Sequence, residues 1–252
     1  MDDDRPRSRR GLLRAAIFVL SAALFGAFLH AAWDRPYLLV PFAVIGVGFG
    51  VFRWWSHRRL VRMLRRGDVG EIIAHWSQSF DRIPHAETMA PLMTATAFAA
   101  YGRVDDARRA LACAARGPAW DAALEHRLFL DVILSTFEGE GDHAAQQASK
   151  LNALPMPDRR DVQERVGTLR QAASALVRAF QHRAQPGDLT RLEAASENSP
   201  LVHWAMRYAA AIVAIDAGER DKARALIDGA PRWPTESAFR NFHDEITGLL
   251  GA

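Results

Sequence analysis

The sequence predicts an all-α protein, in which a transmembrane helical hairpin is followed by a solenoid of antiparallel helix pairs. Two uncharged apolar runs near the N-terminus indicate the hairpin. Apolar residues that recur at intervals of three or four residues indicate helices in the rest of the chain. The composition, with 49% apolar and 24% charged residues among 252, excludes wholesale disorder.

Charge divides the chain into two expected domains, residues 1–66 and 67–252. The first holds 12 of the 32 basic residues and four of the 29 acidic ones, an excess of +8. The second is net acidic, at −5. A single cysteine, Cys113, excludes a disulfide framework and a cysteine-based metal cluster.

The N-terminal domain is expected to be a membrane anchor with spans at about 12–33 and 37–55. Ala15–Trp33 is a run of 19 uncharged residues, and a second uncharged run follows from Tyr37 to Phe52. Aromatic rings favour the membrane–water interface, so we assign Trp33 and Tyr37 to one interface and Trp54 and Trp55 to the other.

Arginine placement predicts the topology. Five arginines precede the first uncharged run and six follow the second, whereas the connecting loop holds only Arg35. The positive-inside rule therefore places both termini in the cytoplasm. The chain has 30 arginines against two lysines, a bias typical of GC-rich bacteria, so the expected location is the bacterial inner membrane. A cleaved signal peptide is the alternative for the first span, although His30-Ala31-Ala32 is a poor cleavage site.

Two features of the anchor allow alternative interpretations. Gly46 and Gly50 form a small-residue face that would pack the hairpin or join two copies in a homodimer. The basic stretch from Arg53 to Arg66 is explained by topology and by attraction to anionic lipid headgroups. Nucleic-acid binding is not expected, because the remaining domain is acidic and lacks a basic stripe.

Periodicity and Gly or Pro breaks predict ten helices in the cytoplasmic domain. The helix over 158–183 carries an a/d stripe, which favours solenoid packing over a short dimeric coiled coil. Short helices joined by tight turns indicate antiparallel pairs. The expected ranges are 69–80, 86–101, 104–116, 120–137, 142–152, 158–183, 188–197, 200–217, 220–229 and 235–249.

One frame of small residues occurs twice. Ala95, Gly102, Ala107 and Pro118 superpose without a gap on Ala211, Gly218, Ala223 and Pro234. Each glycine is expected to end the first helix of a pair. In this frame, residues 86–235 resemble tetratricopeptide (TPR) repeats. The early Trp of that family is replaced by Pro91 and Arg207, and two degenerate repeats lie near Gly141 and Gly187.

The resemblance implies a groove that is lined by the first helix of each repeat and that binds a protein or peptide partner. The candidate groove residues lack a Lys and Asn cluster, so a largely apolar ligand is expected. They are Met89, Leu92, Thr96, Tyr208, Ile212 and Ile215.

Motifs for catalysis are absent from the sequence. It contains no P-loop, no G-x-S-x-G elbow, no H-E-x-x-H pair and no C-x-x-C, and its nine histidines are scattered. No catalytic residue, metal site or cofactor is therefore predicted. The expected function is a membrane-anchored, cytoplasm-facing protein–protein interaction scaffold. The alternative is a membrane-bound enzyme with an unrecognised helical active site, which would require a buried polar cluster.

Overall fold

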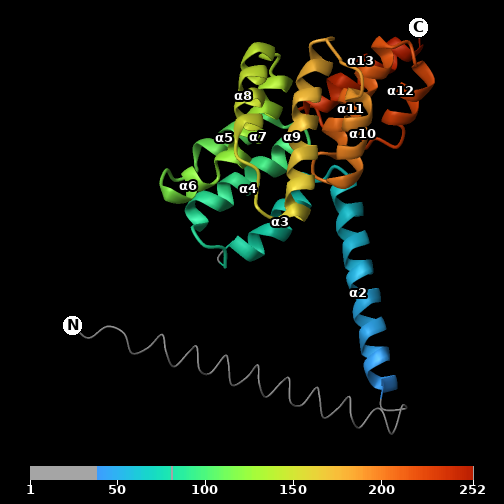
Figure 1. Ribbon diagram of the computed structural model, residues 1–252. Helices are drawn as coiled ribbons and strands as arrows, with labels where there is room; N and C mark the ends of the chain where they lie inside the picture. The colour runs from blue at the N-terminus through green and yellow to red at the C-terminus, as the bar shows by residue number, and fades with distance from the viewer. Residues whose placement is uncertain (1–38, 81, 252) are drawn as a thin grey trace. The chain divides into compact units, whose positions relative to one another are not determined.

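The computed structural model describes residues 39–80 and 82–251, and every regular element in these ranges is a helix. The predicted all-α class is confirmed. The chain divides into two compact units, Met1–Arg59 and Leu60–Ala252. Figure 1 shows the helices of the second unit packed against one another. The helices are α2 (Leu39–Arg65), α3 (Val69–Phe80), α4 (Ala86–Ala100), α5 (Val104–Ala112), α6 (Pro118–Ala122), α7 (Leu124–Phe137), α8 (Gly141–Ala153), α9 (Arg160–Phe180), α10 (Asp188–Asn198), α11 (His203–Asp216), α12 (Arg220–Ile227) and α13 (Ala238–Gly251).

The predicted hairpin is only partly within the described residues. The span over 12–33, together with Trp33 and Tyr37, lies outside them. Among the residues that the structure does describe, no helix is long and apolar enough to cross a membrane. In α2, Arg53 ends the uncharged stretch, and several further arginines follow before the helix ends at Arg65.

Consecutive helices of the second unit pack in pairs. α4 packs on α5, α7 on α8 and α11 on α12, whereas α10 packs on both α9 and α11. The first helices of the pairs also contact one another in the order α4, α7, α9 and α11, and α11 in turn contacts α4. These four helices therefore close a ring around the core of the unit.

The four ring helices end in the same way. After α4, the amide of Gly102 donates to the carbonyl of Ala99 and the amide of Arg103 to that of Phe98. The same two hydrogen bonds recur after α7, α9 and α11. This Schellman ending needs a left-handed residue, which is Gly102, Gly139, His182 or Gly218. The predicted helix ends at Gly102 and Gly218 are confirmed.

Gly102 is further constrained by its surroundings. It has φ of 68°, and a Cβ placed on it would lie 3.0 Å from the ring and the backbone nitrogen of Phe239. The carbonyl of Gly102 accepts a hydrogen bond of 2.9 Å from the amide of Ala238. This turn therefore holds the beginning of α13 against the end of α4.

The last turn of α2 belongs to the core of the second unit. Leu64 is buried, and its carbonyl accepts a hydrogen bond from the hydroxyl of Tyr101. The carbonyl of Arg65 accepts a hydrogen bond of 3.2 Å from the indole nitrogen of Trp204. Residues before Gly67 thus complete the fold of the helical unit.

These contacts predict the shortest stable form of the helical unit. A fragment of residues 60–252 is expected to be more stable than one of residues 67–252 by about 2–3 kcal/mol. The shorter fragment loses the burial of Leu64 and leaves the Tyr101 hydroxyl without its acceptor. Urea unfolding of both fragments measures the difference. Equal stabilities would show that Leu64 and Arg65 are dispensable.

Candidate functional site

An apolar cavity of about 180 Å³ lies within the ring of helices. Its wall comes from α4, α7, α9 and the residues at the beginning of α11. No lining residue carries an acidic, lysine or arginine side chain. The lining residues are Thr96, Ala99, Ala100, His126, Phe129, Leu130, Ile133, Leu169, Ser199, Leu201, Val202 and Ala205.

A threonine and a histidine form a polar pair in this apolar wall. The Thr96 hydroxyl donates to the carbonyl of Leu92 at 2.8 Å, one turn earlier in α4. The Nε2 atom of His126, on α7, lies 2.6 Å from the same hydroxyl oxygen. The His126 side chain lines the cavity and is exposed, and desolvation by the neighbouring protein atoms lowers its pKa.

Aromatic side chains fill the ring at the carboxyl ends of its helices. Phe137 ends α7 and Phe180 ends α9, and both contact rings of α13. The centroid of the Phe239 ring lies 5.3 Å from that of Phe137 and 5.2 Å from that of Tyr208. The Trp233 indole donates a hydrogen bond of 2.6 Å to the Tyr208 hydroxyl. Burial raises the pKa of Tyr208, which keeps the phenol neutral.

The six candidate groove residues fall into three environments. Leu92 and Tyr208 are fully buried and belong to the core. Met89, Ile212 and Ile215 are partly buried and pack against that core. Thr96 lines the cavity. In this arrangement, α13 and Trp233 cover Tyr208, so its ring is not exposed to a partner.

Most of the cavity wall was not identified from the sequence. His126, Phe129 and Leu130 lie on α7, and Leu169 lies on α9, where the repeat pattern is degenerate. A glycine, Gly139, marks the turn after α7, but extending the groove positions to α9 would have required the left-handed turn at His182, which has no glycine to mark it.

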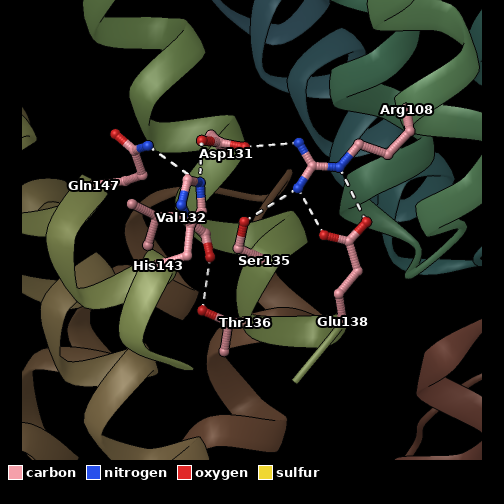
Figure 2. Close-up of polar contacts among 8 residues, drawn as sticks. All are labelled: Arg108, Asp131, Val132, Ser135, Thr136, Glu138, His143 and Gln147. Atoms are coloured by element: carbon pink, nitrogen blue, oxygen red, sulfur yellow. Dashed lines mark hydrogen bonds and ion pairs between the residues drawn. The ribbon is translucent and has the colours of Figure 1, made fainter. Parts of the chain in front are cut away.

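A second polar cluster joins α5, α7 and α8 (Figure 2). The Arg108 guanidinium donates to Asp131 at 2.6 Å, to Ser135 at 3.1 Å and to Glu138 at 2.6 Å. Asp131 also lies 3.2 Å from His143. The hydrogen bond to Glu138 is the main cause of the raised pKa of Arg108. Because the guanidinium donates to side chains in and directly after α7, we interpret this cluster as a structural contact that holds α5 against α7.

The remaining predicted site residues lie in α2. Trp54 and Trp55 are exposed, and the Arg58 guanidinium stacks 4.0 Å from the centroid of the Trp54 ring. A Cβ added at Gly46 or Gly50 would meet nothing within 4 Å, so the small-residue face is open. In the described part of the chain, no group of three His, Cys, Asp or Glu residues is placed to hold a metal ion.

Two histidines predict how stability depends on pH. Burial lowers the pKa of His126 and of His203, whose Nδ1 lies 2.9 Å from the carbonyl of Ser196. Below the ordinary histidine pKa of about 6.5, the unfolded chain binds more protons than the folded one, so stability falls as pH falls. The melting temperature is expected to be lower at about pH 5 than at about pH 7.5. A variant with His126→Phe and His203→Gln is expected to show a smaller difference, and an unchanged difference would contradict the assignment.

Comparisons with protein-family models, with curated proteins and with solved structures found no match to this chain. Fold and site together define an all-α protein whose helical unit contains an apolar cavity with a Thr96–His126 polar pair in its wall.

Proposed function

We propose that this protein is a non-catalytic, membrane-anchored scaffold that binds a protein or peptide partner at the cytoplasmic face of the bacterial inner membrane. The cavity between α4, α7, α9 and α11 is the observation that carries this proposal. Binding sites are typically concave and mostly apolar, with few polar groups. The cavity has this character, and an apolar side chain of the partner would enter it.

The recurring helix ends support a TPR-like architecture. Four successive helix pairs carry the same Schellman ending after their first helix, although only three of the endings use glycine. In TPR-like solenoids the first helices of the repeats form the binding surface. Here the first helices of the four pairs are α4, α7, α9 and α11. The cavity is lined by α4, α7, α9 and the start of α11.

Exposed apolar side chains in α2 support the membrane anchor. Six apolar residues of the segment from Val44 to Phe52 are exposed to between 57% and 67%. Such contiguous apolar surfaces are typical of membrane or protein contacts. Arg53, Trp54 and Trp55 follow directly, and further arginines come next, as expected for a segment that leaves the bilayer on the cytoplasmic side. A second copy that packs on Gly46 and Gly50 would cover part of the same surface.

Site-specific photocrosslinking in intact cells tests the scaffold. A photoreactive residue at Leu201, in the cavity wall, is expected to crosslink to one defined partner. The same residue at Gln163, exposed on α9, serves as the matched control. Filling the cavity with Leu169→Trp should abolish the crosslink. The proposal fails if the products at Leu201 and Gln163 are the same, or if Leu169→Trp leaves them unchanged.

Membrane fractionation tests the anchor. The full chain is expected in the membrane fraction and to resist extraction by carbonate, whereas a chain without residues 1–59 should be found in the soluble fraction. Recovery of both chains in the soluble fraction would contradict the anchor.

A further inference from the structure

The hydrogen bonds around Thr96 determine the tautomer of His126. The only hydroxyl hydrogen of Thr96 is donated to the Leu92 carbonyl, so the hydroxyl oxygen must accept from His126 Nε2 at 2.6 Å. The Nε2 atom therefore carries the ring hydrogen. In a neutral imidazole the other nitrogen is then an acceptor.

The acceptor Nδ1 of His126 has no hydrogen-bond partner among the described residues, and the residue lines the cavity. Desolvation lowers the pKa of His126, so the ring is neutral near pH 7. A ligand in the cavity can therefore satisfy this acceptor with a donor of its own. A second acceptor, such as a carbonyl or an ether oxygen, would leave Nδ1 unsatisfied.

The volume and walls of the cavity limit the remainder of the ligand. A cavity of about 150 Å³ lined by Leu, Ile and Phe is known to bind benzene. The cavity here, at about 180 Å³, therefore admits one aromatic ring with a small polar substituent. Phe129, Leu130 and Leu169 provide apolar walls, and no lining residue would neutralise a charged ligand.

We propose that the cavity receives a tyrosine or tryptophan side chain of the partner, whose O–H or N–H donates to Nδ1 of His126. This inference rests on the proposed function and specifies the residue that the partner inserts. Phenylalanine has the same ring as tyrosine but no donor, so it is the disfavoured competitor.

Three blocked amino acids serve as probes of the side chain in an NMR titration of the full chain in lipid nanodiscs, with empty nanodiscs subtracted. N-acetyltyrosinamide and N-acetyltryptophanamide are expected to bind, and N-acetyltyrosinamide about fivefold more tightly than N-acetylphenylalaninamide. The tyrosine and phenylalanine probes differ only in the hydroxyl group. The ratio of the two affinities is therefore the readout for the hydrogen bond.

Variants test whether the affinity ratio of the tyrosine and phenylalanine probes depends on His126. His126→Phe keeps an aromatic ring but removes the acceptor, and it should reduce the affinity ratio to about one. His75→Phe, at an exposed position of α3, is the matched control and should keep the ratio. Leu169→Trp should weaken the binding of all three probes. If His126→Phe fails to fold, Thr96→Val releases Nε2 and should also lower the ratio.

The outcomes separate the two proposals. Equal affinities of the tyrosine and phenylalanine probes in the unchanged protein would overturn the donor requirement, while the crosslink at Leu201 would still support the scaffold. Binding of free p-cresol without binding of any blocked amino acid would show that the cavity takes small molecules rather than a partner side chain. If no probe binds and no crosslink forms, both proposals are wrong.

Discussion

Replacing Asp188 with alanine is expected to lower the free energy of unfolding by about 2–4 kcal/mol, because it leaves the partly buried guanidinium of Arg178 and the amide of Gln185 without their acceptor. Asp188 is fully buried at the beginning of α10. Its carboxylate accepts two hydrogen bonds from Arg178 of α9, at 2.8 and 2.6 Å. It also accepts one from the amide of Gln185 at 2.8 Å and one from Arg191 at 3.1 Å.

The pKa of Asp188 shows whether burial or the interactions with its partners dominate at this carboxyl group. Burial by itself would raise the pKa of this carboxyl, but the hydrogen bonds and charge of Arg178, together with those from Gln185 and Arg191, outweigh burial and lower it. The folded state therefore favours the ionised form. Urea unfolding of Asp188→Ala near neutral pH measures the loss.

An exposed ion pair provides the control for Asp188. Asp221 and Arg224 lie three residues apart on α12, with a contact of 3.0 Å and an Asp221 side chain that is fully exposed. Asp221→Ala is expected to change the free energy of unfolding by less than about 0.5 kcal/mol. Similar losses in the two variants would contradict the structural role given to Asp188.

Replacing Phe239 with alanine is expected to cost about 3–5 kcal/mol, because it opens a cavity at the centre of the aromatic cluster. Phe239 is fully buried, and its ring centroid lies 5.0 Å from that of Trp233 and 5.2 Å from that of Tyr208. Its ring also touches the turn at Gly102. The loss would therefore be shared by α4, α7, α11 and α13.

Leu249→Ala is the matched control for Phe239→Ala, because Leu249 lies on the same helix and is exposed. Its effect should be less than about 0.5 kcal/mol. Denaturant unfolding followed by circular dichroism compares the two variants. If Phe239→Ala is as stable as Leu249→Ala, α13 is not part of the core that closes the ring.

Much of the helical unit could be predicted because its signals are local. Helix periodicity is visible in short windows, and the predicted range 69–80 coincides with α3. The prediction of one helix over 120–137 was wrong, since α6 ends at Ala122 and α7 begins at Leu124. The predicted helix over 158–183 is α9, which ends at Phe180 because His182 adopts a left-handed conformation.

The candidate site was less predictable, because it depends on which helix faces meet. The groove positions were derived from two repeats as if the solenoid were open. In the structure α11 contacts α4, and the segment from Trp233 to α13 covers Tyr208. Tyr208 and Leu92 are therefore core residues, whereas Thr96 reaches the cavity.

By itself, the sequence determined the helical class, the left-handed turns at Gly102 and Gly218, and the separation of a basic N-terminal part from an acidic helical part. Each of these depends on neighbouring residues or on composition. Only the tertiary structure decided that four helices form a ring, that α13 fills one end of it, and that Thr96 sets the tautomer of His126, 30 residues away in the chain. Such contacts join residues distant in sequence, and their free energy comes from burial and hydrogen bonding that exist only once the helices have packed.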